Sequence, residues 1–133
     1  MKQILIVLTA LILIVSLHFV QGCFLTKTSE ILTAKIQKLE ESLIDNESVK
    51  EDILKEEKEI QVLWKKKQFV FEVFCEHDGV DEIKENISNI HRYISLLDEE
   101  DDIKLELLLE LNILKQRVKE VVNNEKLKLT NVL

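Results

Sequence analysis

The side chains with the clearest chemical potential gather in one short stretch. Residues 75–78 read Cys-Glu-His-Asp, and Asp81 follows His77 by four positions. Thiols, imidazoles and carboxylates bind metals, and an i, i+4 pair shares one helix face. Consecutive helical residues point in different directions, so a metal site would need a further ligand such as His91. A histidine close to a helix end is the simpler interpretation, and we expect no metal and no cofactor.

A second candidate is Trp64, which precedes three lysines at 65–67. Together with His77 and Asp81 it defines a speculative functional patch at the junction of two predicted helices. Such a patch would bind a small ligand or a metal. The lysines either face solvent or contact anionic lipid headgroups, and the net acidity of the chain favours solvent.

No catalytic constellation is recognisable in the sequence. His77-Asp78 is similar to the paired His-Asp of metal-dependent phosphohydrolases, but the upstream histidine such enzymes need is offered only by His18, inside an apolar run. Cys75 has no histidine at the spacing of a known nucleophilic pair, and two glycines cannot build a phosphate-binding loop. The acids at 98–102 predict a solvated turn with helix capping rather than a calcium loop. We therefore expect that the protein is not an enzyme.

The apolar run at residues 4–20 is the feature that locates the protein. It contains one threonine, one serine and one histidine, and extended to Leu25 it is long enough to cross about 30 Å of hydrocarbon. We divide the chain into a membrane anchor or signal segment over 1–25 and a helical bundle over 26–133. Lys2 before the run favours an N-inside orientation, which places the bundle on the extracytoplasmic side of the cell membrane.

Three fates of this run are open. An uncleaved anchor fits the length of the run best. Val20-Gln21-Gly22-Cys23 has the layout of a bacterial lipobox, which makes Cys23 a candidate lipidation site, although Gln21 is unusual at its position. A cleaved secretory signal is the weakest option, because the run exceeds a typical signal core and no Ala-x-Ala-like site follows it.

Composition predicts an all-α fold. The chain of 133 residues has no proline and two glycines, fewer turn formers than a β-sandwich or barrel needs. The formal net charge of −7 disfavours a nucleic-acid partner, since phosphate binding depends on clustered basic residues. Two distant cysteines do not suggest a disulfide framework.

Hydrophobic periodicity predicts an up-and-down bundle of about four amphipathic helices after the run. The expected helices cover residues 28–44, 48–77, 81–97 and 101–124, followed by a short tail that packs on the rest. The clearest seam repeats every three or four residues and comprises Val80, Ile83, Ile87, Ile90, Ile94 and Leu97.

Local signals predict where these helices begin and end. Thr28 or Ser29 can cap the first, and Ser48 with Glu51 forms a capping-box pattern at the second. Gly79 is expected to adopt the left-handed conformation of a helix stop after the second helix.

The chain resembles the bacterial family known as domain of unknown function 4363. The resemblance covers nearly the whole chain and implies a small, helical, membrane-anchored protein without an established activity. It implies an accessory role as well, since members often occur beside a second membrane family. The chain departs from the family pattern at Gly79, where an acidic residue is usual, and at Cys23. The matching features are the apolar span, Lys27-Thr28-Ser29, Trp64, His77 with Asp81 and Ile83, Tyr93-Ile94 and the closing segment 127–133, Leu-Lys-Leu-Thr-Asn-Val-Leu.

Taken together, the sequence predicts a membrane-anchored, non-catalytic interaction or accessory module for another membrane or envelope protein. Its oligomeric state is not encoded in any motif. The alternatives are a small-ligand or metal-binding bundle, and a lipoprotein lipidated at Cys23.

Overall fold

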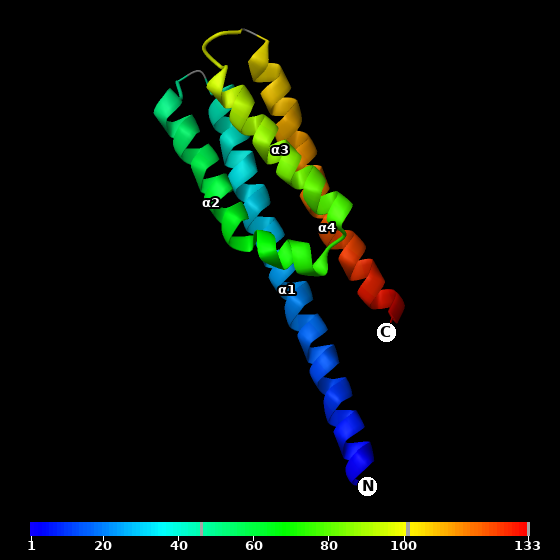
Figure 1. Cartoon of the computed structure of the whole chain (residues 1–133). Coiled ribbons are helices and arrows are strands. Elements are labelled where there is room, and N and C mark those ends of the chain that lie inside the picture. The colour runs from blue at the N-terminus through cyan, green and yellow to red at the C-terminus, as the bar shows by residue number, and fades with distance from the viewer. Residues whose placement is uncertain (46, 101, 133) are drawn as a thin grey trace.

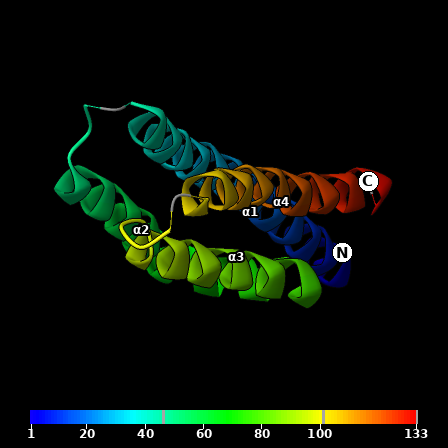
Figure 2. The same cartoon turned by 90° about the horizontal axis from the view of Figure 1, so that it is seen from above.

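The computed structural model describes residues 1–45, 47–100 and 102–132, with side-chain surroundings up to residue 128. Within those residues the fold is all-α, as predicted, and the helices run alternately up and down one bundle (Figure 1). Seen from above, α1 lies beside α4 and α2 beside α3 (Figure 2). The α2–α3 contact is less extensive than the α1–α2, α1–α4 and α3–α4 contacts. The helices are α1 (Lys2–Ile44), α2 (Lys50–Phe74), α3 (His77–Ser95) and α4 (Ile103–Val132).

The first helix is longer than predicted, because the apolar run and the first bundle helix form one continuous α1. Thr28 and Ser29 therefore do not cap a helix start; they are buried inside α1, where its bundle face begins. No residue that breaks helices lies between the run and the bundle, so the helix has no reason to stop. The run stands clear of the bundle: none of its most apolar 18-residue window is buried.

The core is a set of aliphatic stripes, one from each helix. The predicted seam of α3 is confirmed, with Ile83, Ile90 and Ile94 almost fully buried, while Leu97 beyond the helix end is partly buried. On α4 the buried stripe is narrow, since Leu105 and Leu109 face solvent and Leu108 is half-buried. A helix packed against two neighbours buries one face only. The residues buried on α4 are Ile103, Leu107, Leu111, Leu114, Val118 and Val122.

The second helix differs from the prediction at both ends. It begins at Lys50 after Val49, without a side-chain cap, so the predicted capping box from Ser48 to Glu51 does not form. It ends at Phe74 because Cys75 is extended, three residues earlier than predicted. Val49, which precedes the helix, is exposed.

The junction between α2 and α3 corrects the prediction for Gly79. This glycine has no positive φ and lies inside the first turn of α3, not at a helix stop. A β-carbon there would meet Cγ2 of Val121 on α4 at 2.7 Å. Glycine therefore permits close approach of α3 and α4 rather than a left-handed turn.

The last helix continues past the predicted boundary. Residues 125–132, predicted as a separate tail, extend α4, and Lys128 there pairs with Glu76 before α3. The side chains of 129–132 and the whole of residue 133 lie outside the residues whose surroundings are described.

The second half of α2 lies across α1 rather than alongside it. Figure 1 shows this green segment passing α1 at the end of the bundle from which the apolar run emerges. We call residues 65–74 the crossing segment. It is fixed there by Phe71, which is fully buried, and by Lys67, whose ammonium lies 4.6 Å from the centre of the Phe24 ring on α1.

Candidate functional site

The structure does not assemble the predicted patch of Trp64, His77 and Asp81 into a polar site. Trp64 is 4 % exposed and its ring packs at 5.3 Å from that of Phe71, so it belongs to the core. Its position on the apolar stripe of α2 explains this, because a large ring at the core-facing position buries most area. The structure therefore places Trp64 in the core of the bundle.

His77 and Asp81 are both exposed, on the first turns of α3. Asp81 forms an ion pair with Lys84 at 3.8 Å. In the described part of the chain, no group of three or more His, Cys, Asp or Glu side chains could hold a metal ion. His77 and Asp81 thus face solvent at the start of α3, where the carboxylate of Asp78 also offsets the helix dipole.

Cys75 is a buried thiol at the end of α2. Burial raises its pKa to about 11, with a smaller contribution from the carboxylate of Glu125. A thiol that stays protonated at neutral pH is a poor nucleophile and a poor metal ligand. Cys75 thus fills space between helices, as the sequence suggested, whereas Cys23 on α1 is exposed.

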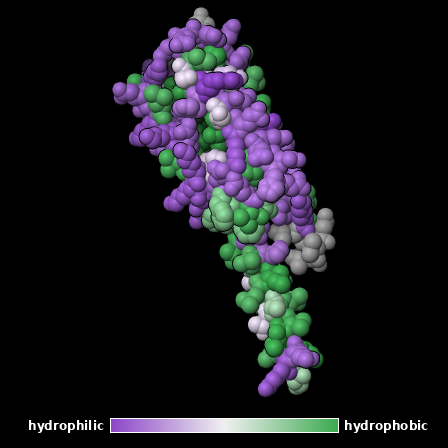
Figure 3. Space-filling model, viewed as in Figure 1, coloured by the Kyte–Doolittle hydropathy of each residue, from purple (hydrophilic) through white to green (hydrophobic). Residues whose placement is uncertain are grey.

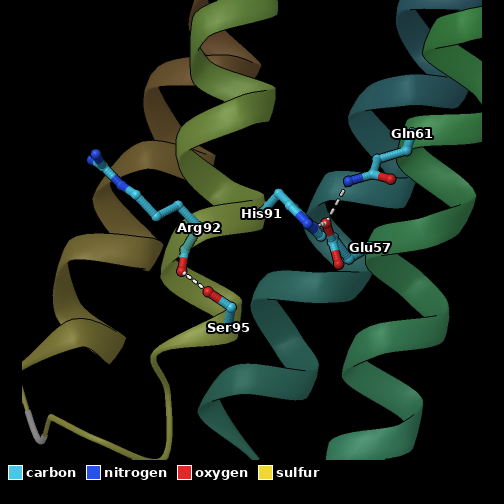
Figure 4. A network of polar contacts seen from close by, with 5 residues as sticks. All are labelled: Glu57, Gln61, His91, Arg92 and Ser95. Atoms are coloured by element: carbon cyan, nitrogen blue, oxygen red, sulfur yellow. Dashed lines mark hydrogen bonds and ion pairs between the residues drawn. The ribbon is translucent and has the colours of Figure 1, made fainter.

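One polar cluster was missed by the sequence analysis. The carboxylate of Glu57 on α2 is 6 % exposed, and its Oε1 accepts hydrogen bonds from Nδ1 of His91 at 2.7 Å and from Nε2 of Gln61 at 2.6 Å. Figure 4 shows His91 of α3 reaching this carboxylate, while nearby Ser95 donates to the Arg92 carbonyl at 2.6 Å. The signal in the sequence was an acid interrupting the stripe from Ile53 to Ile60.

This cluster is structural in character. The carboxylate has two donors, and His91 is 65 % exposed, so nothing holds a substrate between them. Its position matters because it joins α2 to α3, whose contact is less extensive than the α1–α2, α1–α4 and α3–α4 contacts. A buried carboxylate whose hydrogen-bond partners are present adds little net free energy of folding. Its main effect is to favour one arrangement of the helices.

A second buried network joins α3 to α4. Asn86 is 2 % exposed; its amide nitrogen donates to Glu110 and its amide oxygen accepts from Arg117. Arg117 also pairs with Glu82 at 3.3 Å. Each member of the network bonds within the bundle, so it sets the register of the seam and leaves no group for a ligand.

The acidic turn before α4 is solvated, as predicted. Asp98 pairs with Lys50 at the start of α2, and Glu99, Glu100 and Asp102 are exposed. Asp101 lies outside the described residues. The helix connections α1–α2 and α3–α4 share this end of the bundle, opposite the apolar run (Figure 1).

The apolar run itself is the largest feature of the surface. Figure 3 shows a green stalk projecting from a purple bundle, and the green surface extends upward onto the lower end of the bundle. The run has a mean hydropathy of 2.6, and among the described helices α1 alone is long and apolar enough to cross a membrane. None of the side chains in its most apolar 18-residue window is buried in the protein, so the run is a continuous exposed apolar surface of the kind that marks interaction sites.

Where the run meets the bundle, α1 borders a groove of about 710 Å³. Its apolar wall includes Val15 and Phe19, and its polar rim includes Lys27 of α1 and Lys126 of α4. Cys23 and His18 also line it, with Nδ1 of His18 donating to the Ile14 carbonyl at 2.9 Å. The rim also includes Glu30, so the groove combines an apolar wall with a rim of mixed charge.

Comparison with known proteins agrees with the resemblance seen in the sequence. The family model described as "Domain of unknown function (DUF4363)" matches residues 19–132, so the chain belongs to that family. No curated protein and no solved structure matches the chain. The matched region spans the whole bundle and the last residues of the exposed run.

Proposed function

We propose that this member of the family of unknown function 4363 is a membrane-anchored helical bundle that serves as a non-catalytic accessory module for another membrane or envelope protein. The observation that carries the proposal is the fully exposed apolar run, continuous in one helix with a folded bundle. A span of this length and hydropathy is stable in hydrocarbon and unfavourable in water.

The continuity of α1 bears on how the bundle would be presented. A flexible linker would let a tethered domain reorient, but α1 has no break between Lys2 and Ile44. The bundle would therefore stand upright from the bilayer at a fixed height. Because Lys2 precedes the run and favours an N-inside orientation, the bundle would lie on the extracytoplasmic side of the membrane.

The surface available to a protein partner is a stripe on α4. Leu105, Leu109 and Ile113 follow each other at intervals of four residues and are 65 %, 55 % and 38 % exposed. Aliphatic side chains in such a row are a typical helix-docking surface. We call this row the α4 stripe.

The height of the α4 stripe constrains the partner. Lys115 on α4 pairs with Glu40 on α1 at 2.7 Å, so the stripe lies at or beyond the level of Glu40. At 1.5 Å per residue, that level is on the order of 30 Å from the end of the run. The expected partner is thus a membrane protein with a folded part that rises at least this far from the bilayer.

Site-specific crosslinking in native membranes tests the proposal. A photo-crosslinking amino acid at position 109 should capture one reproducible membrane protein, and the same group at Val62, exposed on α2, is the matched control. Equal and diffuse crosslinking at both positions would contradict a partner on the α4 stripe. Recovery of the protein alone at every position would contradict the accessory role.

Lipidation of Cys23 is a second candidate, supported by the exposure of its thiol. In that case α1 would be cut before Cys23, and acyl chains would replace the run as the anchor. The intact mass of the protein from its own membranes decides between the two. The full chain supports the helical anchor, and a diacylated chain that starts at Cys23 supports lipidation.

A further inference from the structure

We infer that the crossing segment of α2 is a second membrane contact: Phe69 and Val73 enter the headgroup region of the bilayer, and Lys65 and Lys66 bind the phosphates of anionic lipids. The inference rests on the proposed membrane anchor. In addition to the anchor, a surface of the bundle would contact lipid, and this contact would fix the orientation of the bundle on the membrane.

The height of the crossing segment agrees with this role. Lys67 lies over the ring of Phe24, and Phe24 follows directly on the apolar run of α1. A span that starts at Ile4 has crossed about 30 Å by that residue, the thickness of the hydrocarbon core. The crossing segment therefore lies at headgroup level when the run spans the bilayer.

The direction of the side chains agrees as well. Phe71 is 0 % exposed and faces the bundle. Residues two positions away on a helix point about 160° from it, so Phe69 and Val73 point away from the bundle. They are 73 % and 54 % exposed. Since α1 lies alongside through Phe24 and Phe71 faces the bundle, Phe69 and Val73 lie on the outer side of this segment, at the end of the bundle from which the apolar run emerges (Figure 1).

The surface chemistry is that of an interfacial helix. Aromatic and aliphatic residues enter the boundary between headgroups and acyl chains, while lysines extend their ammonium groups to phosphates. Each lysine near an anionic surface adds to the electrostatic attraction between the segment and the lipid. Figure 3 shows apolar surface over this part of the molecule, next to the base of the stalk.

The charges around the segment leave it cationic. Glu72 pairs with Lys84 at 2.5 Å, and Glu76 pairs with Lys128 at 2.7 Å. These acids are thereby neutralised by the bundle itself. In the described part of the chain, Lys65 and Lys66 form no ion pair with an acid, so their charges are available to lipid.

Depth-dependent quenching in vesicles tests the inference with the full chain. Single cysteines at 69, at 12 in the run and at 49 at the far end of the bundle would carry an environment-sensitive fluorophore. Cys23→Ser removes the exposed native thiol, and buried Cys75 is spared at neutral pH. The vesicles contain phosphatidylcholine and phosphatidylglycerol, with spin-labelled lipid as the quencher.

The inference predicts that the label at 69 is quenched several-fold more than the label at 49, and more by shallow than by deep quenchers. Lys65→Glu with Lys66→Glu should reduce this quenching, whereas Lys55→Glu with Lys58→Glu on the first half of α2 should not. A label at 69 that is as unquenched as the label at 49 overturns the inference. If the label at 12 is also unquenched, the membrane anchor itself is wrong, which separates the two failures.

Discussion

Gly79 and Val121 are in such close contact that no other residue fits at position 79 without movement: a β-carbon there would lie 2.7 Å from Cγ2 of Val121. Val121 is β-branched and has few accessible rotamers. A β-carbon at position 79 would therefore have to be accommodated by moving α3 and α4 apart. Overpacking of this kind costs about 1–3 kcal/mol, more than the helix propensity that alanine adds. We expect Gly79→Ala to lower the free energy of unfolding by about 1–2 kcal/mol in urea denaturation.

The matched control is the same change in a Val121→Ala background. Removing the γ-methyl groups opens the space, so there Gly79→Ala should be neutral or stabilising. A Gly79→Ala variant that is more stable than the wild type in both backgrounds would show that α3 and α4 are not in close contact at this point.

The helices could be predicted from the sequence, but their ends could not. The seam of α3 was recognisable because six aliphatic residues keep one period. The end of α2 was misplaced because Gly79 was taken as a stop signal. Only the packing of α3 on Val121 explains that glycine, and the two residues are separated by a whole helix in sequence.

The α3 seam should tolerate no charge. Ile90 is 2 % exposed, so Ile90→Asp places an unpaired carboxylate in the core and should unfold the bundle, at a cost of several kcal/mol. Leu109→Asp on the exposed α4 stripe is the control and should leave the helical melt unchanged. A melt of Ile90→Asp that overlays the wild type would refute the assignment of the core.

The cluster at Glu57 predicts an asymmetry between two substitutions. His91→Ala removes one of two donors from a carboxylate that is 6 % exposed, which should cost about 1–3 kcal/mol. Glu57→Leu removes the buried charge and should be neutral or stabilising. Urea denaturation at neutral pH measures the free energy of unfolding of both variants, and an equal decrease in the two would contradict this asymmetry.

The thiols should differ sharply in reactivity. Cys23 is exposed and should react with a maleimide at neutral pH in detergent, while Cys75 should react only on unfolding or near pH 11, where its raised pKa lies. Between about 9 and 11 the folded thiol keeps its proton and the unfolded one has lost it. Stability should therefore fall with rising pH across that window, and less so in Cys75→Ala. Rapid labelling of Cys75 at neutral pH would contradict its burial.

The candidate site was predicted less well than the fold. Trp64, His77 and Asp81 were grouped because they are chemically conspicuous, yet one is core and two face solvent. The crossing segment was beyond prediction, because a uniform helical pattern does not reveal that its second half passes over Phe24. By contrast, the apolar run needed no fold to be recognised, since its length and hydropathy alone are distinctive.

The measurement that tests the central claim most directly is alkaline carbonate extraction of membranes that contain the full chain, combined with its intact mass. We predict that the uncut protein stays in the membrane pellet. Ile6→Asp with Ile12→Asp should release it, because each aspartate in the middle of a span costs about 2.5–3.5 kcal/mol. The control Leu105→Asp should stay in the pellet. Full-length wild-type protein in the soluble fraction would contradict the membrane anchor and with it the proposed function.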